Sequence, residues 1–141
     1  MKILITGACG FIGRNLINEL RDHHELRLLD RVRPEEATVF VGGASPNGRA
    51  AAPLNIDLPV IQAEITDPEA MVAAAAGMDA VIHLAGEPRG LPEIAVPIFR
   101  DNAMGTFVAI DAAHRAGVSR FFCASSINAY GTFYWRLSGK P

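Results

Sequence analysis

The sequence predicts an α/β fold in which helices cover both faces of a mostly parallel β-sheet. Short apolar runs alternate with segments of helical periodicity, and the first apolar run ends in a glycine-rich turn. This alternation is typical of βαβ units, whose parallel strands are joined by right-handed helical crossovers. The length of 141 residues suits one domain with a substantial hydrophobic core.

The first βαβ unit is predicted from two apolar runs on either side of a helical segment. Lys2–Thr6 is an aliphatic run that stops at glycine, which indicates a buried strand. Phe11–Arg21 predicts a helix, because several of its leucine and isoleucine residues fall on one side. Leu26–Asp30 is a second short apolar run and is predicted to form the neighbouring strand.

A less regular stretch follows the second strand. Residues 31–57 are rich in proline, glycine and alanine, and we interpret them as a variable excursion, with a small strand at Thr38–Val41 as the alternative. Leu58–Ala63 is predicted to be the third main strand. The next helix has Thr66 or Asp67 as its expected N-cap, because both side chains can accept backbone hydrogen bonds.

The second half of the chain predicts two more strands and one long helix. Asp79–Leu84 is the fourth predicted strand and Ser119–Ala124 is the fifth, after which we expect the sheet to stop. Between them, a helix that ends at Gly117 carries an apolar stripe at helical spacing, made of Phe99, Ala103, Phe107, Ile110 and Ala113.

Composition and charge exclude several classes of protein. The net charge is −2 and the basic residues form no stripe, so nucleic-acid binding is not expected. No apolar run approaches the roughly 20 residues of a membrane helix, and no His/Cys/Asp cluster has metal-ligand spacing. Two cysteines, Cys9 and Cys123, do not suggest a disulfide framework, so we expect a cytoplasmic protein with reduced thiols.

The turn after the first strand has glycines at three spaced positions. Gly7 permits a tight turn off the strand, Gly10 lets the backbone approach a diphosphate, and Gly13 lets the helix pack close to the sheet. The first helical residues, Phe11 and Ile12, then offer free backbone N–H groups and the positive end of the helix dipole. This pattern predicts a Rossmann-type fold that binds a dinucleotide.

An acidic residue at the end of the second strand strengthens this interpretation. The Asp30 carboxylate can accept hydrogen bonds from both ribose hydroxyls of NAD, whereas it would repel the 2′-phosphate of NADP. Arg31 and Arg33 follow and could partly offset that repulsion, so NAD is favoured over NADP. The alternative is a solvated aspartate that merely opens a turn.

Cys9 lies at the helix start, where a thiol pKa can be lowered, although a small residue that fits the turn is the simpler interpretation.

Five segments in order resemble the extended short-chain dehydrogenase/reductase family, which includes NAD-dependent epimerases and dehydratases. Thr6–Gly13 has the spacing of that family's glycine loop, and the other four matching segments are Glu64-Ile65, His83–Gly86, Asn102–Thr106 and Ala124–Gly131. The resemblance implies that Glu64 and Ile65 flank the adenine. It places Leu84, Ala85 and Gly86 under the nicotinamide-side ribose and phosphates, with Asn102 supporting the cofactor side. For His83 we expect structural support rather than catalysis.

The same resemblance assigns a catalytic role to Ser126, which stands four residues before the Tyr130-Gly131 pair. Its hydroxyl would bind the substrate oxygen that gains or loses a proton; the alternative is a small residue that ends a strand. The family's acid/base pair, Tyr-x-x-x-Lys, is missing, because the only lysines are Lys2 and Lys140 and neither follows a tyrosine at that spacing. We therefore expect residues 1–141 to be an incomplete, truncated NAD(P)-binding domain without a substrate domain, inactive alone.

The resemblance predicts the cofactor-binding portion of an NAD-dependent sugar or nucleotide-sugar epimerase or dehydratase. Two alternatives stay open, a sugar or uronate dehydrogenase of the same family and a non-catalytic dinucleotide-binding module. The expected partner is a small sugar or nucleotide-sugar, with no nucleic acid and no membrane. Phe121 and Phe122 lie in the last predicted strand, whose uncovered side favours self-association, so a homo-oligomer is left open.

Overall fold

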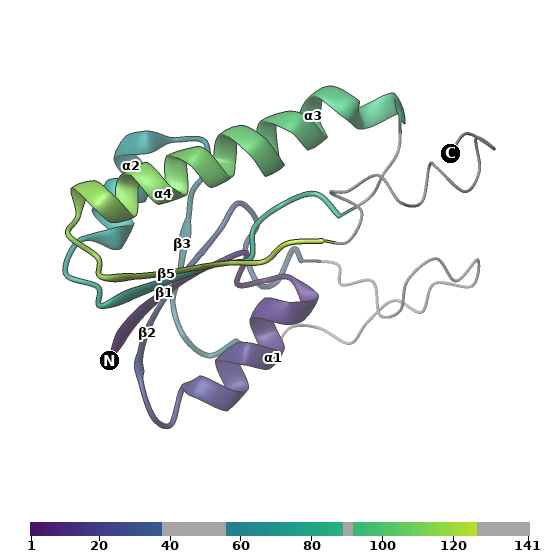
Figure 1. The fold of residues 1–141 in the computed structure, drawn as a ribbon. Coiled ribbons are helices and arrows are strands. Elements are labelled where there is room, and N and C mark those ends of the chain that lie inside the picture. Colours follow the sequence, from purple (N-terminus) through teal and green to yellow (C-terminus); the bar gives the residue numbers. More distant parts are fainter. Residues whose placement is uncertain (38–55, 89–91, 127–141) are drawn as a thin grey trace, which may run out of the picture.

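The computed structural model describes residues 1–37, 56–88 and 92–126, which form a five-stranded parallel sheet with helices on both faces (Figure 1). The order of the strands across the sheet is β3-β2-β1-β4-β5. Their bounds are Lys2–Thr6 (β1), Glu25–Asp30 (β2), Val60–Gln62 (β3), Ala80–His83 (β4) and Arg120–Cys123 (β5). The predicted Rossmann-type fold is confirmed, while Thr38–Val41, for which a small strand is the alternative, lies outside the described residues.

The first two helices begin where the sequence predicts them. Helix α1 spans Phe11–Leu20 and α2 spans Pro68–Ala75. The N-cap of α2 is Asp67 rather than Thr66: its Oδ1 accepts the backbone N–H groups of Glu69 (3.0 Å) and Ala70 (3.1 Å). A composite helix then runs from residue 92 to 115 through η1 (Pro92–Ile94), α3 (Ala95–Phe99), the π-helical η2 (Arg100–Met104) and α4 (Gly105–Arg115).

The sheet separates two hydrophobic cores, because successive side chains of a strand point to opposite faces. Ile3 and Ile5 of β1 pack on one side with Ile17 of α1. Leu4 packs on the other side, in the core that α2 and α4 cover and that contains Met71. Figure 1 shows the same division, with α1 on one face of the sheet and α2 and α4 on the other.

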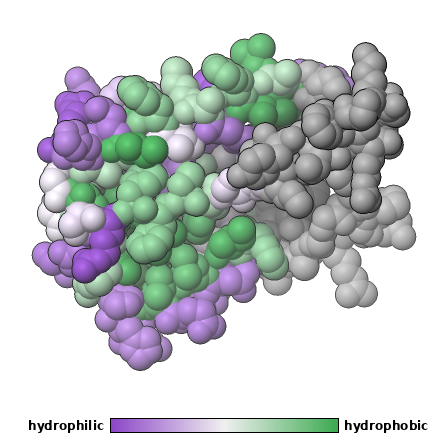
Figure 2. Space-filling view, in the orientation of Figure 1, coloured by the Kyte–Doolittle hydropathy of each residue, from purple (hydrophilic) through white to green (hydrophobic). Residues whose placement is uncertain are grey.

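The long helix is confirmed, but most of the predicted apolar stripe does not face the core. Of its five residues only Ala113 is buried, and Phe99 and Phe107 are 73% and 70% exposed. The buried face of α4 consists of Gly105, Val108, Ala109, Ala112 and Ala113. Small side chains allow the helix to approach the sheet and α2 closely, which leaves the bulkier face outside. Figure 2 shows hydrophobic surface along the side of the molecule that this helix forms. Within the described ranges, no helix has the length and apolar character needed to cross a membrane.

Candidate functional site

The predicted functional loops all leave the sheet at one end, where the carboxyl ends of its parallel strands meet. Thr6 is in register with both Leu29 and His83, and His83 is in register with Cys123. The residues that directly follow these strands are therefore neighbours in space. In open α/β sheets this is the end at which ligands bind.

Two of the three loop glycines are required by the fold itself. Gly7 has φ +71°, and a Cβ at this position would lie 2.7 Å from the Ala85 backbone nitrogen. A Cβ at Gly13 would lie 2.8 Å from the carbonyl oxygen of Ala8. Gly10 differs, because within the described ranges a Cβ there would approach the Gly7 carbonyl oxygen alone, at 3.1 Å. Gly10 therefore faces an open space beside the loop.

The N-terminus of α1 is open in a way that the N-terminus of α2 is not. Gly10 is the N-cap of α1 and supplies no side-chain hydrogen bond, and the first turn contains no acidic residue. In α2, by contrast, the Asp67 carboxylate already accepts two of the terminal N–H groups. Phe11 and Ile12, the first two residues of α1, are 49% and 58% exposed. The start of α1 thus offers backbone donors and positive dipole charge to an external anion.

The structure places the Asp30 carboxylate directly beside this loop. Oδ2 accepts the Cys9 backbone N–H (2.9 Å) and Oδ1 accepts the Val32 N–H (3.1 Å). Burial, together with the negative charges of Asp30 and Glu35, raises the pKa of the Cys9 thiol to about 12. Cys9 is therefore a protonated, buried thiol at neutral pH, and the idea that the helix start lowers its pKa is wrong.

Both arginines that follow Asp30 are held by side chains of the protein. Arg31 Nη1 donates to Asp101 Oδ2 (3.0 Å), and Arg33 Nε donates to Gln62 Oε1 (3.2 Å). Asp101 is a buried carboxylate in η2, and its Oδ1 also accepts a hydrogen bond from Arg100 Nε (2.7 Å). No spacing in the sequence signals this arrangement, because Arg31 and Asp101 meet only when the fold brings η2 beside the segment that follows β2.

Asn102 clamps the loop that follows β4. Its Oδ1 accepts the Glu87 backbone N–H (2.7 Å) and its Nδ2 donates to the Glu87 carbonyl oxygen (3.0 Å). A Cβ at Gly86 would lie 2.9 Å from Asn102 Oδ1, so a glycine is needed at this approach. Among the residues expected to flank an adenine, Glu64 is exposed, whereas Ile65 is buried in the core beneath Gly105 of α4.

His83 links three of these segments through a hydrogen-bonded chain whose direction can be assigned. The Thr106 hydroxyl donates to the Asn102 carbonyl oxygen (2.7 Å), so it accepts from His83 Nε2–H (3.3 Å). His83 Nδ1 is then the acceptor for the Thr6 hydroxyl (2.7 Å). Burial lowers the pKa of His83 to about 4, which keeps the imidazole neutral. The interpretation of His83 as structural support agrees with this position.

The low pKa of His83 predicts a dependence of stability on pH. The unfolded histidine, with its ordinary pKa of 6.5, binds a proton that the folded one takes up only near pH 4. The free energy of unfolding should therefore decline as the pH falls from 6.5 to 4, with a contribution from His83 of up to about 3 kcal/mol. Urea unfolding between pH 8 and pH 4 measures this effect. His83→Gln should show a shallower decline, and an unchanged slope would contradict the assignment.

Ser125 and Ser126 follow β5 at the same end of the sheet and are exposed. The Ala124 N–H donates to the His83 carbonyl oxygen (3.0 Å), so these serines leave the sheet beside the loop that starts at Leu84. Tyr130, Tyr134 and Lys140 lie outside the described residues. Ser126 thus lies at the carboxyl end of β5.

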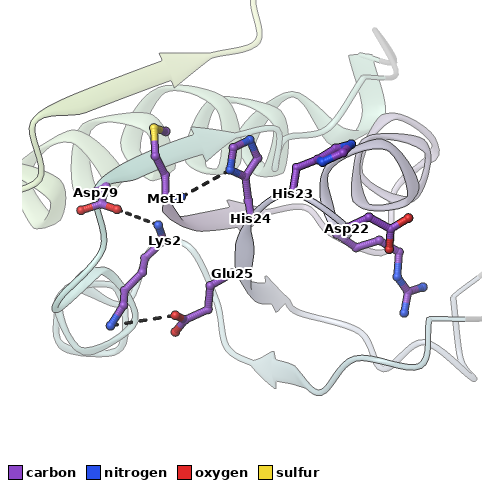
Figure 3. Close-up of a pocket in the computed structure, with 8 residues that line it drawn as sticks. Met1, Lys2, Asp22, His23, His24, Glu25 and Asp79 are labelled. Atoms are coloured by element: carbon purple, nitrogen blue, oxygen red, sulfur yellow. Dashed lines mark hydrogen bonds and ion pairs between the residues drawn. The ribbon is translucent and has the colours of Figure 1, made fainter.

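A broad hollow of about 600 Å³ lies at the opposite end of the sheet (Figure 3). Polar contacts hold its lining residues, including Lys2 N–H to Asp79 Oδ2 (2.7 Å) and the amino terminus to His24 Nδ1 (3.4 Å). These residues precede β1, β2 and β4 or stand at their first positions, far from the glycine loop. Over residues 1–37, 56–88 and 92–126, no three His, Cys, Asp or Glu side chains come together as a metal site. The hollow is a surface feature separate from the candidate site.

Comparison with known proteins supplies an independent view of the same arrangement. Residues 3–134 match the model of the NAD dependent epimerase/dehydratase family. The chain is 36% identical over 133 residues to the NAD-dependent glucose-6-phosphate dehydrogenase of Haloferax volcanii, covering 93% of this chain and 45% of that protein.

Two solved structures with NAD bound are also similar. One is a short-chain dehydrogenase/reductase superfamily protein from Agrobacterium tumefaciens (TM-score 0.69, 30% identity, covering 92% of this chain and 34% of that one). The other is MoeE5 in complex with UDP-glucose and NAD (TM-score 0.70, 28% identity, covering 93% and 38%). The chain thus spans less than half the length of each of these relatives.

Proposed function

The chain belongs to the NAD dependent epimerase/dehydratase family, and from this premise we propose that the carboxyl end of its sheet binds NAD. The observation that carries the proposal is the open N-terminus of α1, with Gly10 facing free space and the Asp30 carboxylate held beside it. The N-terminus of α1 suits a diphosphate, and the neighbouring Asp30 carboxylate can accept hydrogen bonds from the hydroxyls of the adjoining ribose.

Each predicted site residue has a place in this proposal. The backbone N–H groups of Phe11 and Ile12 would bind the diphosphate, and Asp30 would accept the ribose hydroxyls. Glu64 and the backbone at Ile65 would border the adenine, with Arg31 on the same side.

Near the nicotinamide, the loop would be formed by Leu84, Ala85 and Gly86. Asn102 holds this loop through its two hydrogen bonds to the Glu87 backbone.

The proposed reaction class is that of a sugar or nucleotide-sugar epimerase or dehydratase, of which this chain is the cofactor-binding portion. NAD supplies the hydride acceptor, and the chain's own residues bind and orient the cofactor. Ser126 stands at the carboxyl end of β5, where its hydroxyl would bind the reacting substrate oxygen. A sugar dehydrogenase of the same family is the second candidate, since the Haloferax volcanii relative is named as one.

Calorimetric titration of the purified 141-residue chain tests the cofactor proposal directly. We expect saturable binding of NAD and of ADP-ribose, which carries the same diphosphate and adenosine ribose, and weaker binding of NADP. Nicotinamide mononucleotide, which lacks the adenosine half, serves as the matched negative ligand. Absence of NAD and ADP-ribose binding by a folded chain would refute the proposal.

The reaction class needs a separate assay. We expect no turnover of UDP-glucose by this chain, because its sequence contains no Tyr-x-x-x-Lys acid/base pair. In a version of the protein that carries such a pair, a dehydrogenase would release NADH in proportion to substrate, whereas an epimerase or dehydratase would form product without net NADH. Absorbance at the NADH band together with product chromatography separates these two reactions.

A further inference from the structure

A buried carboxylate, Asp101, lies between two arginines beside the candidate site. Asp101 is 4% exposed, and its two oxygens accept hydrogen bonds from Arg31 Nη1 (3.0 Å) and Arg100 Nε (2.7 Å). The side chains of both arginines are about half exposed, at 47% and 48%. A buried acid that holds two solvent-facing bases is an arrangement in which the acid determines where the bases point.

Arg31 is the residue directly after Asp30, the proposed ligand of the adenosine ribose. An arginine at this position is the type of group that binds the 2′-phosphate of NADP, through a charge-assisted and often bidentate hydrogen bond. Here the guanidinium is turned instead towards the composite helix, where the Asp101 carboxylate neutralises its charge. Arg33, the other nearby cation, is held by Gln62.

We propose that Asp101 is a residue that determines cofactor specificity, because it withholds Arg31 from a 2′-phosphate and so favours NAD over NADP. This inference rests on the proposed function. It adds a second element to the selectivity that Asp30 provides, and places that element in η2, 70 residues after Arg31 in the chain. Asp101 makes no contact with the cofactor in this proposal and acts only through Arg31.

Neutralising Asp101 should release Arg31 without disrupting the fold. Breaking a buried ion pair is costly when it leaves an uncompensated charge in the interior. Both arginines face solvent, so neutralising Asp101 leaves no such charge. Arg100 would keep a second acidic neighbour: its pKa is raised by its hydrogen bond and charge pairing with Asp101, and also by the nearby Glu64 carboxylate. The main change expected in Asp101→Asn is therefore freedom of the Arg31 side chain.

The test is a mutant cycle on the full 141-residue chain, with calorimetric affinities for NAD and NADP. In Asp101→Asn we expect the ratio of the NADP Kd to the NAD Kd to fall about tenfold, the effect of one hydrogen bond to a charged group. The NAD Kd should change by less than about twofold. The fragments AMP and adenosine 2′,5′-bisphosphate should show the same selective gain, since they differ only in the 2′-phosphate.

Two double variants identify the residue responsible. Arg31→Ala with Asp101→Asn should return the ratio to its wild-type value, whereas Arg100→Ala with Asp101→Asn should keep the gain. Asp101→Ser repeats the neutralisation with a smaller side chain, and thermal unfolding checks that each variant is folded. A ratio unchanged in both Asp101 variants, or a gain that survives the loss of Arg31, overturns the inference while NAD binding stands. Failure of the wild type to bind NAD would instead overturn the proposed function.

Discussion

Gly10→Val is expected to weaken NAD binding by at least about a hundredfold while the chain remains folded. Gly10 has extended backbone angles (φ −72°, ψ 169°) that valine readily adopts, and in the described part of the chain a Cβ there would approach the Gly7 carbonyl oxygen alone, at 3.1 Å. The branched side chain would then stand where the diphosphate approaches the start of α1. Loss of two charge-assisted hydrogen bonds to the phosphates accounts for an effect of this size.

Calorimetric titration with NAD measures this loss, and urea unfolding shows whether the fold is intact. The other loop glycines are matched controls for a different outcome. Gly7→Ala places a Cβ 2.7 Å from the Ala85 nitrogen, and Gly13→Ala places one 2.8 Å from the Ala8 oxygen. Both variants should therefore have a lower free energy of unfolding. Wild-type NAD affinity in a folded Gly10→Val variant would exclude the loop as the diphosphate site.

Asp30→Ala should weaken NAD binding by roughly a hundredfold or more and NADP binding by less. The carboxylate would accept two ribose hydroxyls of NAD, and hydrogen bonds to a charged group contribute about 1.5–3 kcal/mol each. NADP has a phosphate in place of one hydroxyl, and Asp30 repels that phosphate. Removal of the carboxylate should therefore reduce the affinity for NADP less than the affinity for NAD. Calorimetric Kd values for both cofactors give the two losses.

The structure adds a second consequence of this substitution. Asp30 accepts the N–H of Cys9, so alanine would leave that donor without its partner and lower the free energy of unfolding by about 1–3 kcal/mol. Asp30→Asn retains an oxygen for Cys9 but has no charge, and it separates the loop effect from the ribose effect. Equal losses for NAD and NADP in both variants would exclude Asp30 as the ribose ligand.

Much of the fold could be predicted because its signals are local. The five strands, the N-cap region of α2 and the turn at Gly7 all follow from the residue types of short segments. Parallel strands bring their carboxyl ends together, so the glycine loop, Asp30 and the loop after β4 could also be predicted to share one end of the sheet. The side-chain contacts that hold these loops could not be predicted in the same way.

The composite helix illustrates the limit. Both of its faces carry apolar residues at helical spacing, so periodicity alone cannot identify the buried face. The larger residues, Phe99 and Phe107, suggested the wrong side, and the small residues Gly105 and Ala109 form the contact with the core. Packing against the sheet and α2 selects the face that allows close approach, and that choice depends on the shapes of elements distant in the sequence.

Short sequence patterns are sufficient to predict the Rossmann-type order of strands and helices, the glycine turn and the acidic end of β2, because each depends on neighbouring residues and on rules common to parallel sheets. Three other features are established by tertiary packing: Asp101 holds Arg31, His83 lies neutral between Thr6 and Thr106, and the phenylalanines of the composite helix face outward. Those features depend on groups brought together from up to 77 residues apart. Their partners are chosen by packing geometry, for which the linear spacing of residues contains no signal.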